Sequence, residues 1–383
     1  MRTGEQGSRI EVISRHISAL DGLRAFAILA VIFHHCGEYY LLQNSSPASL
    51  MWGFVERLGT GVDLFFALSG FLITGILLDS LQRPYFFKRF YWRRGLRIWP
   101  LYYTFLFAGY LFHRRAFHGI GFAPFALYYR NFLGPDHYSD IYLGQFWSLC
   151  VEEQFYLVWP LVIYFTPKRL RMPLIFFLMA AAFLFRVLLL SRGVYLYVVY
   201  RLPFCHMDVL LAGAAVAVLT RHGMSMSALR KVCWIALAVG FFGLTLMARA
   251  TSTRFSFLIF SSTLTCISLL FGSIVGLCAR GCGKFASAIL GGSLLRAISK
   301  RSYAMYVFHL VPLYAFYKLL ANMRLLPLRV PLALLVILMI GLITYGMAWL
   351  SWRYLESPFL RLKSWEWFSK ISTTNTDDTH PTE

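Results

Sequence analysis

The sequence predicts an all-α, polytopic membrane protein with about ten transmembrane helices and both termini in the cytoplasm. Of its 383 residues, 58% are hydrophobic and only 14% are charged, whereas soluble domains carry about 25% charged residues. Apolar segments long enough to cross a bilayer recur along the chain, since a transmembrane helix needs about 20 such residues. The third observation is that basic residues gather in alternate loops.

The ten expected spans follow one another with short connections. Each is a mainly apolar stretch flanked by polar or basic residues, and the expected ranges are 20–42, 60–80, 98–112, 144–165, 173–190, 205–220, 232–248, 256–279, 303–321 and 331–352.

The distribution of charge sets the orientation. With a cytoplasmic N-terminus, the inside segments hold 24 Lys and Arg residues and the outside loops hold 10. The positive-inside rule therefore places both termini in the cytoplasm. The formal net charge of +20 reflects this topology and contact with anionic lipid headgroups. No basic soluble module interleaved with aromatic residues indicates nucleic-acid binding.

The chain divides into three parts. Residues 1–19 form a cytoplasmic segment that leads into a full-length span without a small-residue cleavage site, as in a signal anchor. Residues 20–360 form the transmembrane domain, and 361–383 form a cytoplasmic tail whose polar end we expect to be disordered. The seven cysteines lack the paired spacing of a disulfide framework or a zinc site, so we expect no metal.

Arg24 and His35 lie within the first predicted span and indicate a functional site. Ionisable residues inside a membrane helix are costly and mark function by default. Their separation of 11 residues is about three helical turns, so both lie on one helix face, roughly 16 Å apart along the axis. One elongated ligand can therefore contact both residues.

Asp63 lies near the outer end of the second span, in the stretch GVDLFFALSGFLIT. Packing does not readily account for a carboxylate there, so Asp63 is a candidate supporting residue, with a loop-edge cap as the alternative. Ser69 and Gly70 follow near mid-membrane, where small residues let helices approach closely. We interpret this pair as a packing feature.

Six basic residues lie between Arg83 and Arg97, in the predicted cytoplasmic loop before the third span. If this stretch is helical, Arg93 and Arg97 are one turn apart and form a cationic ridge. Arginine binds phosphate bidentately, so Arg89, Arg93, Arg94 and Arg97 are candidate ligands for an anion. Taken alone, the run favours the other interpretation, which is positive-inside charge facing lipid headgroups.

Two adjacent carboxylates, Glu152 and Glu153, lie in the fourth span within WSLCVEEQFYLVWP. They are expensive there unless they are paired or face water. Adjacent helical residues diverge by about 100°, so one can face a cavity while the other meets a cation such as Arg186 in the next span. A purely structural ion pair accounts for one carboxylate but not easily for both.

Further polar residues lie at the ends of later spans. Arg201 and Asp208 flank the start of the sixth span, and Tyr303 and His309 lie in SYAMYVFH in the ninth. We treat all four as supporting candidates. His309 is not assigned a catalytic role, because a lone membrane histidine is more often a packing residue than a catalytic one. Glu356, near the end of the last span, is interpreted as structural.

Together these segments resemble the acyltransferase-3 family of integral membrane O-acyltransferases. The matching stretches occur in family order over about 18–360: LDGLRA, the Arg-x10-His spacing that ends at His35, GVDLFFALSGFLIT, the arginine-rich run into IWP, WSLCVEEQFYLVWP and SYAMYVFH. The chain departs from the pattern in two ways. His34 precedes His35, so the catalytic assignment depends on spacing, and Cys150 stands where many relatives carry a small or hydroxyl residue.

The resemblance implies a ten-helix enzyme that moves an acyl group, usually acetyl, from acyl-CoA to a hydroxyl of a carbohydrate or polyketide. The nucleotide end of acyl-CoA suits the basic surface, and the pantetheine arm would run from Arg24 toward His35. An imidazole titrates near pH 6.5, which suits His35 as general base. Glu152 or Glu153 would orient this imidazole, and Arg186 or nearby Asn and Tyr groups would support the oxyanion. A route through an acyl-histidine stays open.

Two other classes of function stay open. A transporter or flippase of a lipid-linked sugar or small anion also carries charges on several helices, although the sequence shows no inverted repeat. A receptor or scaffold predicts that His35 and Glu153 are dispensable. The acceptor, acyl chain length, side of transfer and oligomeric state are not fixed by the sequence. The outside loop 113–143 is either an acceptor entrance or a connector, and family grounds favour a bacterial inner membrane.

Overall fold

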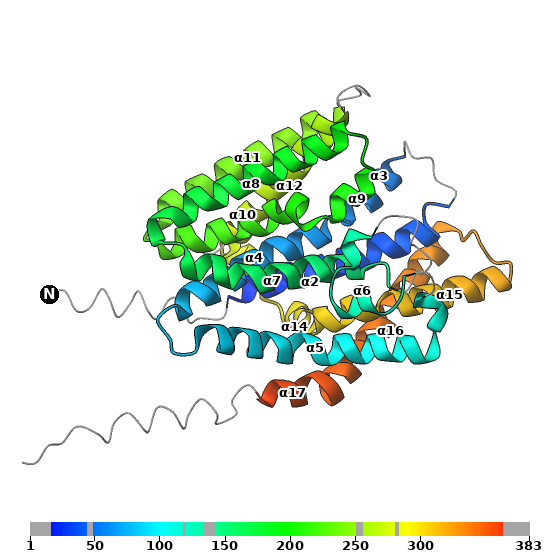
Figure 1. Ribbon diagram of the computed structural model, residues 1–383. Helices are drawn as coiled ribbons and strands as arrows, with labels where there is room; N and C mark the ends of the chain where they lie inside the picture. Colours follow the sequence, from blue (N-terminus) through cyan, green and yellow to red (C-terminus); the bar gives the residue numbers. More distant parts are fainter. Residues whose placement is uncertain are drawn as a thin grey trace, which may run out of the picture.

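The computed structural model describes residues 17–43, 49–117, 120–133, 143–249, 256–279 and 283–362, and within these ranges every regular element is helical (Figure 1). The predicted terminal segments therefore lie mostly outside the described residues. The longer helices are α2 (Ser18–Tyr40), α4 (Gly61–Ser80), α5 (Phe86–Phe112), α7 (Phe146–Phe165), α8 (Arg171–Ser191), α10 (Pro203–Arg221), α11 (Met226–Arg249), α12 (Ser256–Ala279), α14 (Ser293–Phe308), α15 (Leu310–Asn322) and α16 (Val330–Ser351). The shorter ones are α3 (Leu50–Leu58), α6 (Ala123–Ala126), α9 (Leu196–Arg201), α13 (Lys284–Leu290) and α17 (Ser357–Arg361).

Helices α2 and α4 form the middle of the bundle. Helix α4 packs against α2, α10 and α12, and α2 packs against α14 and α16. Figure 1 shows α8, α10, α11 and α12 as a group on one side of α4, with α5, α14 and α16 on the opposite side. The C-terminal end of α2 lies at the same end of the bundle as α3 and α15.

The polytopic, all-helical prediction is confirmed within the described residues. Seven helices there are long and apolar enough to cross a membrane, and the bent pair α14 and α15 makes an eighth if it counts as one span. Helices α5 and α7 cover the third and fourth predicted spans but are not among these seven. The count of ten and the orientation of the termini therefore stay predictions.

The ninth predicted span is broken rather than continuous. Helix α14 begins earlier than expected, and it meets α15 at a bend of 53° beside His309. Pro312 explains the break, because proline has no N–H to bond to the Phe308 carbonyl and its ring crowds that group. Irregular backbone at membrane depth is tolerated where it is buried in protein or lines a cavity. The break lies beside His309, which is fully buried in the protein.

The basic run before the third span is helical and not a loop. Helix α5 begins at Phe86 and continues through the run to Phe112. A charged, aromatic stretch at the end of a long helix does not show the apolar pattern of a span, which is why the sequence suggested a loop. The helix fixes which arginines point inward.

Small residues set the distance between α4 and α10. Gly70 lies against the backbone of Leu210, and Gly213 lies against the backbone of Ala67, so a Cβ at either position would clash. The packing interpretation of Gly70 is confirmed. Its neighbour Ser69 instead faces a cavity.

Candidate functional site

A cavity lies between α2, α4, α5, α7 and α14. It encloses about 750 Å³ when its open mouth is included. Its walls combine three arginines, two glutamates and several hydroxyl groups with apolar side chains. The lining residues are Arg24, Val62, Phe65, Phe66, Ser69, Arg94, Arg97, Ile98, Ser148, Leu149, Glu152, Glu153, Tyr156, Ser302, Tyr303 and Tyr306.

Arginines from two helices meet in this cavity. Arg24 comes from α2, and Arg94 and Arg97 come from one turn of α5. The Arg94 guanidinium lies 4.0 Å from the centre of the Tyr156 ring. Of the other predicted anion ligands, Arg93 is exposed, Arg89 is half-buried, and neither lines the cavity. Of the four arginines predicted to bind an anion, only Arg94 and Arg97 therefore line this cavity.

The two glutamates have different surroundings. Glu152 Oε1 accepts a hydrogen bond of 2.5 Å from Ser69 Oγ, and the Tyr156 hydroxyl donates to the same Ser69 Oγ at 3.0 Å. Glu153 Oε1 and Arg94 Nε are buried, and neither has a hydrogen-bond partner in the described part of the chain. Buried polar groups are nearly always satisfied. Both side chains line the cavity, so they are the first candidates to bind a polar ligand there.

His35 forms a pair with His309 at the helix break. Its Nδ1 lies 3.0 Å from the Val31 carbonyl and 3.3 Å from His309 Nε2, while His309 Nδ1 lies 2.7 Å from the Tyr306 carbonyl. Because a carbonyl only accepts, each Nδ1 carries the hydrogen. His309 Nε2 then accepts from His35, and His35 Nε2 keeps its lone pair. This tautomer is the one a general base requires.

Tyr306 connects the histidine pair to the cavity. Its ring lies 5.5 Å from that of His309, and its hydroxyl lies 2.5 Å from Ser148 Oγ, so it contributes to both places. His35 lies about 16 Å from Arg24 along α2, as the helical rise requires. Arg24 and His35 therefore lie near opposite ends of α2, and His35 does not itself line the cavity.

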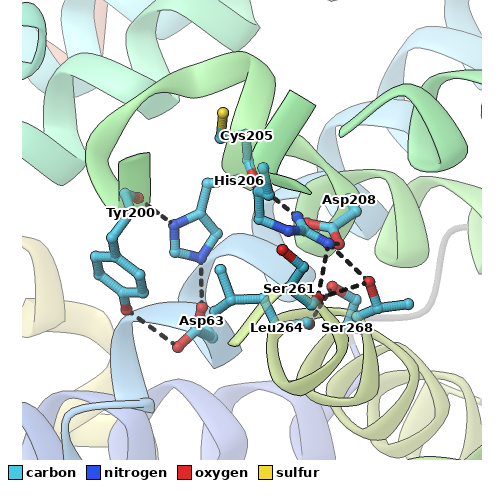
Figure 2. Close-up of polar contacts among 10 residues, drawn as sticks. Asp63, Tyr200, Cys205, His206, Asp208, Ser261, Leu264 and Ser268 are labelled. Carbon is cyan, nitrogen blue, oxygen red and sulfur yellow. Dashed lines mark hydrogen bonds and ion pairs between the residues drawn. The ribbon is translucent and has the colours of Figure 1, made fainter. Parts of the chain in front are cut away.

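Several other candidates form a separate buried network, shown in Figure 2. Asp63 Oδ1 lies 2.6 Å from His206 Nε2, and the Tyr200 hydroxyl donates to Asp63 Oδ2 at 3.4 Å. Arg186 donates to Asp208 Oδ2 at 2.8 Å and to the Cys205 carbonyl at 2.6 Å. These contacts tie α4, α8, α9 and α10 together, and none of these residues lines the cavity.

Two expectations about charge partners need correction. Arg186 pairs with Asp208 and not with Glu152 or Glu153. Within the described ranges, the ring of His35 bonds to Val31 and His309, so the orienting partner expected to be a glutamate is another histidine. The physical reason is that both glutamates line the cavity and His35 does not, and Glu152 accepts a hydrogen bond from Ser69 there.

The remaining candidates divide between the cavity and the helix ends. Tyr303 lines the cavity and donates to the Ile98 carbonyl at 3.0 Å. The Arg201 guanidinium lies 3.6 Å from the centre of the Tyr197 ring and does not line the cavity. Glu356 is buried and accepts from Ser351 at 3.1 Å, in keeping with the structural interpretation.

Five hydroxyl residues of the cavity were missed as site residues. They lie inside motifs that the sequence singled out for their charges, but a hydroxyl group in an apolar span carries no strong local signal. They are Ser69, Ser148, Tyr156, Ser302 and Tyr306.

Comparison with known proteins gives a consistent result. The family model of the acyltransferase-3 acyltransferase domain matches residues 17–353. The peptidoglycan O-acetyltransferase OatA of Listeria monocytogenes is 36% identical over 163 residues, which are 38% of this chain and 24% of that protein. The O-acetyltransferase OatA of Staphylococcus aureus is 27% identical over 387 residues, covering 93% of this chain and 59% of that protein. The chain thus spans less than two thirds of these relatives, and no solved structure matches.

Proposed function

Because the chain belongs to the acyltransferase-3 family, we propose that it is a membrane O-acyltransferase. It moves an acyl group, with acetyl as the first candidate, from acyl-CoA to a hydroxyl of a carbohydrate. The observation that carries this proposal is the free Nε2 of His35, whose other nitrogen is held by Val31 and His309. This oriented base lies on the same helix as Arg24 of the charged cavity.

The cavity suits the anionic end of the donor. Arg24, Arg94 and Arg97 present guanidinium groups, which bind phosphate oxygens with paired hydrogen bonds. The unpaired Glu153 Oε1 and Arg94 Nε match a chain that carries amide donors and acceptors, as pantetheine does. With the phosphates at the arginines, the arm would follow α2 for about 16 Å and bring the thioester toward His35.

The transfer then requires two proton movements. His35 Nε2 takes the proton of the acceptor hydroxyl as its oxygen attacks the thioester carbonyl. The carbon–sulfur bond breaks, and the imidazolium returns the proton to the leaving thiolate. His309 and the Val31 carbonyl hold the ring throughout. The alternative of an acyl-histidine uses the same nitrogen as nucleophile.

The relatives suggest the class of acceptor and the location. The Listeria relative is named a peptidoglycan O-acetyltransferase, so we propose a cell-envelope glycan as acceptor and a bacterial inner membrane as the location. Peptidoglycan strands are the first candidate, because the name of the Listeria relative specifies peptidoglycan as its acceptor.

The proposal is tested by release of free CoA thiol from acetyl-CoA, with solubilised peptidoglycan strands as acceptor. General-base catalysis contributes about 10²–10⁴-fold, so His35→Ala should lose transfer by that factor or more while staying folded. His34→Ala is the matched control, because His34 bonds to the Val55 carbonyl on the neighbouring helix and should keep transfer. Turnover at the wild-type rate by His35→Ala would contradict the assignment.

An ion or lipid-sugar carrier is the second candidate, and the broken span at His309 favours it. Discontinuous helices are typical of transporter binding sites. A carrier would move solute across liposomes without consuming acetyl-CoA, whereas the enzyme would release thiol. The same purified protein serves both assays.

A further inference from the structure

A cluster of three tyrosines lies just beyond His35 on α2. Tyr39 follows His35 by four residues, so it lies on the same face of α2, one turn nearer the Tyr40 end. Its ring centre is 5.2 Å from that of Tyr314 and 5.1 Å from that of Tyr317, and both of these residues belong to α15. The hydroxyl oxygens of Tyr39 and Tyr314 are 3.1 Å apart.

The cluster is accessible on the side away from the arginines. Tyr39 and Tyr317 are partly exposed, while Tyr314 is buried behind them. A second hollow, lined by Tyr40, Gln43 and Arg329 among others, opens at the same end of α2. None of the three tyrosines lines this hollow, but the ring of Tyr40, which does, lies 6.5 Å from that of Tyr317. His35 therefore stands between the arginine-lined cavity and a region rich in aromatic rings and hydroxyl groups.

We propose that Tyr39, Tyr314 and Tyr317 form the binding subsite for the acceptor sugar. This inference rests on the proposed function and adds the place from which the acceptor approaches. The C–H face of a pyranose packs on an aromatic ring, and phenol hydroxyls both donate to and accept from sugar hydroxyls. Cβ atoms four residues apart on a helix are about 5–6 Å apart, so a sugar on Tyr39 presents a hydroxyl to His35.

The hydroxyl groups argue for a sugar rather than for an acyl chain or a lipid tail. An apolar occupant would leave the Tyr39 and Tyr317 hydroxyls without a new partner, which is unfavourable for polar groups removed from water. The charged cavity on the other side of His35 already suits the donor. Separate donor and acceptor regions let both substrates bind before the proton moves.

The test compares acceptor and donor kinetics in purified full-length variants, with solubilised peptidoglycan strands and acetyl-CoA. Tyr39→Ala and Tyr317→Ala should each raise KM for the glycan about tenfold and leave KM for acetyl-CoA unchanged, since stacking and hydroxyl contacts are lost. Tyr39→Phe should have a smaller effect, because it keeps the ring. Tyr195→Ala is the control, since Tyr195 is 73% exposed and lies far along the chain on another loop.

The outcomes separate this inference from the proposed function. Unchanged KM for the glycan, or an equal rise in KM for acetyl-CoA, would overturn the subsite while the enzyme assignment stands. Transfer by the wild type to a non-carbohydrate acceptor alone would overturn the class of ligand. Binding of acetyl-CoA by the tyrosine variants, measured by calorimetry, shows that they are folded. If the wild type neither binds acetyl-CoA nor releases thiol, the proposed function fails first.

Discussion

Two groups of charged side chains in this protein, one fully buried and one lining the cavity, are arranged in opposite ways. In the network around α10, Arg186 lies 2.8 Å from Asp208, and His206 lies 2.6 Å from Asp63. In the cavity, the arginines and glutamates form no ion pair with one another among the described residues. Acidic and basic side chains are therefore paired in the network and unpaired in the cavity.

This difference distinguishes charges that hold helices together from the charges that we propose bind the donor. Both ring nitrogens of His206 face oxygen atoms, Asp63 on one side and the Tyr200 carbonyl at 2.8 Å on the other, so the ring is enclosed. Arg186 is fully buried and reaches α12 through Thr265 at 2.7 Å. Arg186 Nε and Asp208 Oδ1 have no hydrogen-bond partner among the described residues, but the charges of both side chains are already paired with each other. The arginines and glutamates of the cavity form no such pair within the described ranges.

The largest effect is expected from breaking the network. Arg186→Met leaves Asp208 buried without its counter-charge, and removing one partner of a buried pair costs about 3–5 kcal/mol. We therefore expect a marked fall in the thermal unfolding temperature of the protein in detergent. KM for acetyl-CoA of the fraction that stays folded should be unchanged.

The double variant Arg186→Met, Asp208→Leu provides the control. Replacing a buried ion pair with apolar residues of similar size is often neutral, so it should regain most of the lost stability. If Arg186→Met stayed stable but lost turnover, Arg186 would belong to the reaction, as the sequence allowed, and the comparison would fail.

The next effect concerns the cavity. Arg94→Ala should raise KM for acetyl-CoA about 10–100-fold, because a hydrogen bond to a charged group contributes about 1.5–3 kcal/mol. Stability should change little, since loss of the Tyr156 contact is offset by less repulsion from Arg24 and Arg97. Arg93→Ala, on the exposed face of the same helix, should change KM less than about fivefold. If Arg94→Ala and Arg93→Ala raised KM equally, the donor would bind at the exposed face of α5 and not in the cavity.

The sequence predicted those features that depend on local pattern. The apolar length of α2, α4, α8 and α16 gave their positions, and the 11-residue spacing placed Arg24 and His35 on one face of α2. Pro312 is a local indication of a helix break, but the long apolar stretch around it favoured one continuous span. A run of arginines suggested a loop where helix α5 already begins.

The partners of the site residues could not be predicted, because they depend on tertiary packing. Ser69 and Glu152 are 83 residues apart, and His35 and His309 are 274 residues apart. No periodicity links such positions, so the sequence predicts only packing for Ser69 and a supporting role for His309. The sequence suggested Glu152 or Glu153 as partners of Arg186, because they lie in the preceding predicted span, whereas Asp208 lies on a helix that packs directly against α8.

The smallest effect is expected at His309, and it tests whether this residue positions the base. His309→Ala removes one of two groups that hold His35 Nδ1, and the Val31 carbonyl remains. A single hydrogen bond contributes about 0.5–1.5 kcal/mol, so kcat should fall roughly 2–10-fold, with KM for both substrates unchanged. His309→Gln offers a side-chain carbonyl that can accept from Nδ1–H, so it should recover part of kcat, which a filler such as His309→Leu cannot. Equal losses for Gln and Leu at equal thermal stability would show that His309 only fills space at the helix break, and the orientation of His35 would then depend on its own helix alone.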